Sequence, residues 1–135
     1  MTEQQFDPGM FAIDSQRLDI EWERQSAACF ETGRLAAQAR LCVEDLKRQL
    51  DVRRAEASTN IRRDPSKFGF TAKPTESAIE AAITLLPQVQ DLQDKIAHAR
   101  YQFDLCNAAV SALENKKKGL ESLTQLRAMN YYSAK

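Results

Sequence analysis

The sequence contains few of the residues that break helices or build catalytic loops. Only four glycines and four prolines occur in 135 residues. The glycines are isolated from one another, so they cannot form a phosphate-binding loop. A single histidine, no Cys-x-x-Cys pair and no His-x-x-x-His spacing leave no recognisable set of metal ligands. We therefore expect no metal site, no cofactor and no enzymatic activity.

Long hydrophobic runs are also missing. No apolar stretch approaches the ~20 residues that a membrane-spanning helix needs. The first five residues, MTEQQ, do not resemble a signal peptide. Three scattered cysteines argue against a disulfide framework. These absences predict a cytoplasmic protein that does not interact with membranes.

The formal net charge is zero, yet the charges are segregated along the chain. Residues 1–52 hold 10 acidic and 6 basic side chains, and residues 74–115 hold 6 and 2. By contrast, residues 53–73 hold 6 basic and 2 acidic side chains, and residues 116–135 hold 5 and 1. Such blocks create local fields that the total charge hides. Either the blocks neutralise one another, within or between subunits, or a basic block faces a polyanion.

Apolar residues repeat at seven-residue spacing over the first half of the chain, which is typical of a long helix packed against a partner. One row contains Trp22, Cys29, Ala36, Val43, Leu50 and Ala57. The second row contains Leu18, Ala39 and Leu46, and is interrupted by Gln25, Thr32 and Arg53. After an N-terminal arm (1–13), Asp14 is a suitable N-cap residue. We predict one helix over residues 14–63.

Pro65 and Gly69 predict a turn over residues 64–74, because proline and glycine end a helix. A return helix is expected over 75–117, capped by Thr75 or Ser77, with a kink or a restart at Pro87. Its two apolar rows are Val89, Ile96, Phe103 and Val110, and Leu92, Ala99, Cys106 and Leu113. The repeat loses its phase at Lys117, and Gly119 follows. We therefore predict a separate short C-terminal helix over 119–132.

The lengths of these helices determine the expected architecture. The first helix would extend about 73 Å at ~1.5 Å per residue, about twice the roughly 37 Å diameter of a compact chain of this size. We therefore predict an all-α fold, a single domain (1–135) built as an elongated, coiled-coil-like antiparallel helical hairpin. Apolar residues beside the rows predict assembly into a homo-oligomer that covers them. These residues are Leu35, Cys42, Ile79, Ile83 and Leu85.

The predicted turn and the end of the first helix contain the strongest candidate for a binding site. Six cations and two phenylalanines lie within residues 53–73. Single-stranded nucleic acid is bound by cations that contact phosphates and by aromatic rings that stack on bases. The candidate residues are Arg53, Arg54, Arg62, Arg63, Lys67, Phe68, Phe70 and Lys73. Alternatively, the phenylalanines close the end of the hairpin, and the arginines are solvated or pair with Glu56, Glu76 and Glu80.

A second basic block lies near the C-terminus and contains Lys116, Lys117, Lys118, Arg127, Tyr131, Tyr132 and Lys135. In a hairpin this block returns to the acidic start of the first helix. The acidic residues there are Asp14, Asp19, Glu21, Glu23 and Glu31. The sequence favours pairing between the two, within or between subunits, and leaves contact with DNA as the alternative.

Six segments in this order resemble the UvsY family of phage recombination mediators. They are FAID (11–14), RRDPSKFGF (62–70), KPTESAI (73–79), AAVSALE (108–114), KKKGLESL (116–123) and MNYY (129–132). Family members carry basic residues late in the long first helix. This chain has Arg53 and Arg54 there, but departs from the more basic pattern at Asp51.

The resemblance implies a small helical protein that forms ring-like homo-oligomers and binds single-stranded DNA. It further implies that the protein helps a RecA-type recombinase displace single-strand-binding protein, in the host cell cytoplasm if the gene belongs to a phage. The residues alone leave another class open: a non-catalytic helical-hairpin structural or adaptor protein that oligomerises without binding DNA.

Overall fold

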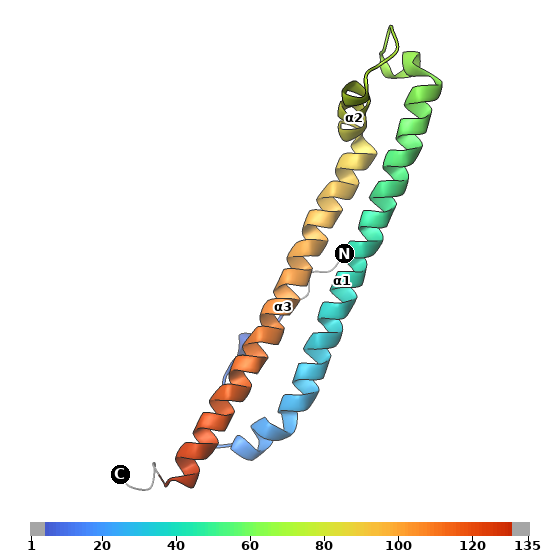
Figure 1. Ribbon diagram of the computed structural model, residues 1–135. Coiled ribbons are helices and arrows are strands. Elements are labelled where there is room, and N and C mark those ends of the chain that lie inside the picture. The colour runs from blue at the N-terminus through green and yellow to red at the C-terminus, as the bar shows by residue number, and fades with distance from the viewer. Residues whose placement is uncertain (1–4, 131–135) are drawn as a thin grey trace. The chain divides into compact units, whose positions relative to one another are not determined.

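The structure, a computed structural model, describes residues 5–130 and is all-α over this range (Figure 1). Its α-helices are α1 (Leu18–Arg63), α2 (Glu76–Thr84) and α3 (Pro87–Ala128). Two short 3-10 helices, η1 (Pro8–Phe11) and η2 (Pro65–Phe68), precede and follow α1. No described helix is long and apolar enough to cross a membrane.

The chain divides into two compact units, and α1 and α3 each contribute a segment to both. The first, here called the terminal unit, comprises the chain up to Ala39 and the chain from Gln102 onward. The second, here called the bend unit, is Arg40–Tyr101 and includes η2 and α2. Within each unit the segments of α1 and α3 run antiparallel, which confirms the predicted antiparallel helical pairing (Figure 1).

Helix α1 begins at Leu18, later than predicted, because Asp14 forms a separate turn instead of capping the helix. The Asp14 Oδ1 accepts a hydrogen bond from the Gln16 amide at 3.0 Å, and its carbonyl accepts one from the Arg17 amide at 3.0 Å. Farther back, the Asp7 carboxylate accepts from the Gly9 amide at 2.9 Å and begins η1. Two local turns therefore precede α1.

Two polar residues that interrupt the apolar row, Gln25 and Thr32, are buried in the terminal unit. The Gln25 side-chain amide donates to the Leu113 carbonyl of α3 at 2.8 Å. The Thr32 hydroxyl donates to the Ala28 carbonyl of its own helix at 3.0 Å. Because buried polar groups are tolerated when they are hydrogen-bonded, the row of core-facing positions continues through both residues.

The predicted separate C-terminal helix is wrong over its described part, because α3 continues through Lys117 and Gly119 to Ala128. In the row of Val110 the buried position moves to Ala109, whereas the second row stays buried through Leu113 and Leu120. Such drift is expected, since a helix of 3.6 residues per turn departs from a seven-residue repeat. A Cβ on Gly119 would lie 2.9 Å from the Ile13 Cδ1, so this glycine allows the arm to approach α3 closely. Residues 131–132 of the prediction lie outside the described residues.

The return segment of the bend unit restarts at Pro87, the second of the two expected outcomes, and so consists of two helices. Thr75 caps α2 by accepting a hydrogen bond from the Ala78 amide at 3.2 Å, whereas Ser77 lies inside the helix. Helix α2 ends at Thr84, and Pro87 is the first residue of α3. Proline suits this position because a first-turn residue needs no backbone N–H donor.

The core of the bend unit is a cluster of Ala57, Ile61, Ile79, Ile83 and Val89. The expectation that Ile79 and Ile83 are uncovered is wrong, because α2 buries both against α1 and α3. Leu85 is exposed as expected, whereas Leu35 and Cys42 are half-buried. Part of the apolar surface that predicted an oligomer is therefore covered within the chain itself.

Candidate nucleic-acid interface

The bend unit gathers exposed cations where α1 ends and the chain reverses. Arg62 and Arg63 lie in the last turn of α1, where the helix dipole favours positive charge. The reversal is held by Asp64, whose carboxylate accepts from the Ser66 hydroxyl at 2.7 Å, and by Gly69. Gly69 has a φ of 83°, a left-handed conformation that glycine adopts without strain. The reversal leads into α2 and brings its acidic residues to α1.

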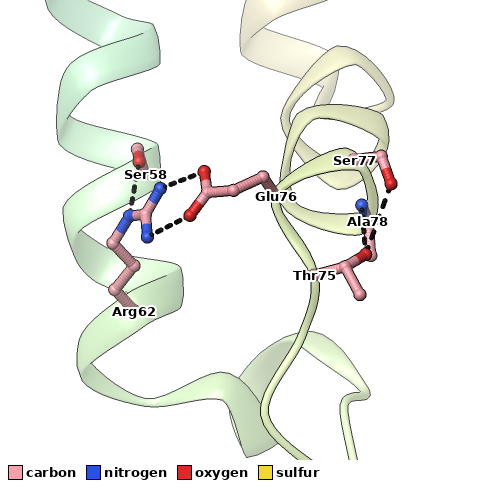
Figure 2. Close-up of polar contacts among 6 residues, drawn as sticks. All are labelled: Ser58, Arg62, Thr75, Glu76, Ser77 and Ala78. Atoms are coloured by element: carbon pink, nitrogen blue, oxygen red, sulfur yellow. Dashed lines mark hydrogen bonds and ion pairs between the residues drawn. The ribbon is translucent and has the colours of Figure 1, made fainter.

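Arg62 is the most constrained of these cations (Figure 2). Its two terminal nitrogens donate to the two carboxylate oxygens of Glu76 at 2.8 and 2.6 Å, and its Nε donates to the Ser58 hydroxyl at 3.2 Å. The hydrogen bonds from Arg62 lower the pKa of Glu76, and the charge of Lys73 lowers it further. The same pairing raises the pKa of Arg62. The pair therefore stays ionised at neutral pH.

Three further cations of the predicted site also have carboxylate partners. Arg54 lies 3.5 Å from Glu80, which follows Glu76 by one turn of α2. Arg53 lies 3.4 Å from Glu56, one turn along α1. Lys67 lies 3.7 Å from Asp64. Most of these side chains are strongly exposed, and exposed ion pairs contribute only about 0–1 kcal/mol to stability.

Arg63 and Lys73 differ from the other cations of the predicted site. Both are exposed, and neither forms a hydrogen bond or an ion pair with residues 5–130, although the charge of Lys73 acts on Glu76. Together with Arg62 and Lys67 they place four cations in residues 62–73, where Asp64 is the one acidic residue. This set of four is here called the cationic bend.

The two phenylalanines of the predicted site pack into the protein. Phe68 and Phe70 are half-buried and lie against the core cluster of the bend unit. Each ring face that packs against this core is unavailable for stacking on a base. This packing agrees with the alternative interpretation of the sequence, in which the two phenylalanine rings close the end of the hairpin. In the candidate interface the cations are therefore the exposed groups, and the rings hold the turn against the core.

The second basic block divides between internal and exposed residues. In the terminal unit, Lys116 Nζ lies 2.9 Å from Glu21 Oε2 and donates to the Met10 carbonyl at 2.9 Å. Arg127 donates to the Ser15 carbonyl. Lys117 and Lys118 are exposed. Lys116 thus forms the intrachain pairing expected for this block, whereas Tyr131, Tyr132 and Lys135 lie outside the described residues.

The other side chains that could bind a metal or react do not cluster in the described part of the chain. Within residues 5–130, no three His, Cys, Asp or Glu side chains are placed to hold a metal ion. Burial raises the pKa of the Cys106 thiol, so this cysteine is a neutral core residue. His98 is exposed on α3. Ser58 is a contact of Arg62 that was not predicted, and its place one helical turn before Arg62 is the signal that could have indicated it.

No protein-family model matches the chain, and no curated protein or solved structure matches it significantly.

Proposed function

We propose that this protein is a non-catalytic recombination mediator that binds single-stranded DNA through the cationic bend. The observation that carries the proposal is the exposure of four cations within residues 62–73, two of which form no ion pair in the described chain. The resemblance to the UvsY family supplies the context. In that context the protein assembles with itself and promotes loading of a RecA-type recombinase over single-strand-binding protein in the cytoplasm.

The geometry of Arg62 supports phosphate binding. A guanidinium group recognises carboxylate and phosphate with the same two-pronged hydrogen bonding. Ser58 and Glu76 already orient the Arg62 side chain, so a phosphate that replaces Glu76 finds the donors in position. Because the Arg62–Glu76 pair is exposed to solvent, its exchange for a phosphate carries a small penalty.

Replacing Arg63 and Lys73 together by alanine is expected to weaken binding of a single-stranded oligonucleotide. The slope of log affinity against log salt should become less negative by about 1.4, since each phosphate contact on a single strand contributes roughly 0.7. Fluorescence anisotropy over a salt series measures both quantities. The matched control replaces Arg24 and Arg40, which are also exposed and unpaired among the described residues, and should leave the slope unchanged. Equal slopes for the two double variants would exclude the cationic bend as the DNA site.

Glu76→Gln is expected to have the opposite effect. The substitution keeps the shape of the side chain but removes the negative charge that occupies Arg62. Affinity for single-stranded DNA should therefore rise, and the salt dependence should become steeper. The matched control is Glu31→Gln, which releases Arg34 from an exposed pair in the terminal unit. Tighter binding by both variants would indicate a general charge effect, and weaker binding by Glu76→Gln would contradict a role for Arg62.

A second function has a specific observation in its favour. Arg53, Arg54, Arg62 and Lys67 each pair with a carboxylate of the same chain, and both phenylalanines pack on the core. These contacts suit a helical-hairpin adaptor that oligomerises without binding DNA. A gel shift with single-stranded oligonucleotides at low and moderate salt separates the two functions. The adaptor function predicts no shift at either salt concentration.

A further inference from the structure

A cavity of about 290 Å³ lies in the bend unit between the end of α1, η2 and the start of α3. Its apolar lining consists of Ala57, Phe68, Leu86 and Pro87. Phe68 is half-buried, and it both packs against the core cluster and borders the cavity. Sites for drug-sized ligands typically measure ~300–1,000 Å³, so this cavity suits a single planar ring system better than a larger ligand.

The polar lining of the cavity is uncharged or internally neutralised. Asn60 of α1 and Gln88 of α3 are exposed, and neither side-chain amide forms a hydrogen bond with residues 5–130. Each amide offers one acceptor and two donors. The two charged lining residues, Arg53 and Glu56, lie 3.4 Å apart and neutralise each other. The cavity therefore suits a neutral, planar group with hydrogen-bonding edges.

Cations of the cationic bend lie next to this cavity. Residues three or four apart share a face of a helix, so Asn60 and Arg63 lie on the same side of α1. Arg63 is one turn beyond Asn60, about 4.5 Å at ~1.5 Å per residue. It forms no ion pair with residues 5–130. Lys67, also exposed, directly precedes Phe68 in η2. Arg62 lies on a different side of α1, where it faces α2 (Figure 2).

We propose that this cavity holds one base of the single strand, an inference that rests on the proposed function. The bases of a single strand are unpaired, so a base can leave its neighbours and form hydrogen bonds through its edges with a protein. Here the amides of Asn60 and Gln88 bind the edge of the base, and the apolar lining covers its faces. Arg63 and Lys67 contact the adjoining phosphates. A phosphate is a poor occupant of the cavity itself, because the lining has no net charge.

Removal of the two amides tests the base site. Wild-type protein is expected to bind oligothymidylate about tenfold more tightly than an abasic strand of the same length, a gain of one or two hydrogen bonds. The double variant Asn60→Leu with Gln88→Met keeps the size of both side chains and should bind the two strands with nearly equal affinity. Its salt dependence should not change, because no cation is removed. Fluorescence anisotropy measures these affinities, and circular dichroism checks that the helices are intact.

The matched control is Gln90→Met with Gln93→Met, which removes two exposed amides of α3 that do not line the cavity. This variant should keep the preference for oligothymidylate. Equal binding of both strands by wild-type protein would overturn the base site and leave the proposed function intact. So would a preference that survives in the Asn60→Leu, Gln88→Met variant. Absence of binding to either strand would overturn both the base site and the proposed function.

Photochemical cross-linking locates the base directly. A strand that carries 5-iodouracil in place of thymine cross-links to aromatic side chains that its bases touch. Mass spectrometry of the cross-linked protein should place an adduct at Phe68, which borders the cavity. The yield at this residue should fall in the Asn60→Leu, Gln88→Met variant. Adducts found only at Tyr101, which is 52% exposed and outside the cavity, would overturn the proposal.

Discussion

Lys116→Met is expected to destabilise the protein by about 3–5 kcal/mol, measured by urea unfolding. The Lys116 and Glu21 side chains are only 9% and 13% exposed, and their charged atoms lie 2.9 Å apart. The Glu21 Oε2 atom has no hydrogen-bond partner within residues 5–130, so the ion pair is its compensation. Removal of one partner from a buried pair leaves an uncompensated charge, which accounts for the size of the effect.

Two further variants separate the ion pair from other consequences of changing Lys116. Lys117→Met alters the neighbouring exposed lysine and should change the free energy of unfolding by less than about 0.5 kcal/mol. The double variant Glu21→Leu with Lys116→Met should recover most of the lost stability, because apolar side chains often replace a buried ion pair without loss. If Lys116→Met is as mild as Lys117→Met, the pair is not buried in solution as the structure describes.

The periodicity of the sequence predicted the helices but not all of the core. Val43, Leu46, Ile96, Ala99 and Leu113 are buried as their spacing indicates. The periodicity of a sequence shows only which residues are apolar. A polar residue can also be buried when another part of the fold supplies a hydrogen-bond partner. The Leu113 carbonyl that accepts from Gln25 comes from another helix, as does the carboxylate that neutralises Lys116. For this reason Gln25 interrupts the apolar pattern although it is buried, whereas Thr32 is buried with a partner in its own helix and Arg53, the third interruption, is exposed.

The candidate site was predictable in its location and less so in its contacts. The sequence identifies a cluster of cations next to a turn, and the turn forms where Pro65 and Gly69 predict it. Which cations remain without a carboxylate depends on where α2 begins. Because Thr75 caps α2, Glu76 and Glu80 lie one turn apart on the side of α2 that faces Arg62 and Arg54. A helix that began at Ser77 would not include Glu76.

Ile83→Ala is expected to cost about 2–5 kcal/mol of stability, because this side chain is 1% exposed in the core of the bend unit. It packs with Ile61 and Ile79, so truncation leaves a cavity between helices that are already joined by short connections. Urea unfolding measures the loss. The matched control lies two residues away: Leu85 is 71% exposed, and Leu85→Ala should change stability by less than about 0.5 kcal/mol.

The isoleucine and leucine variants also test how the cationic bend is organised. Helix α2 carries Glu76, so a loosened α2 should release Arg62 from its carboxylate. Ile83→Ala is therefore expected to move single-stranded DNA affinity in the same direction as Glu76→Gln, under conditions where the variant is still folded. Leu85→Ala should leave the affinity unchanged. Equal stability of the Ile83→Ala and Leu85→Ala variants would contradict the packing of α2 on α1, and with it the pairing of Arg62 with Glu76.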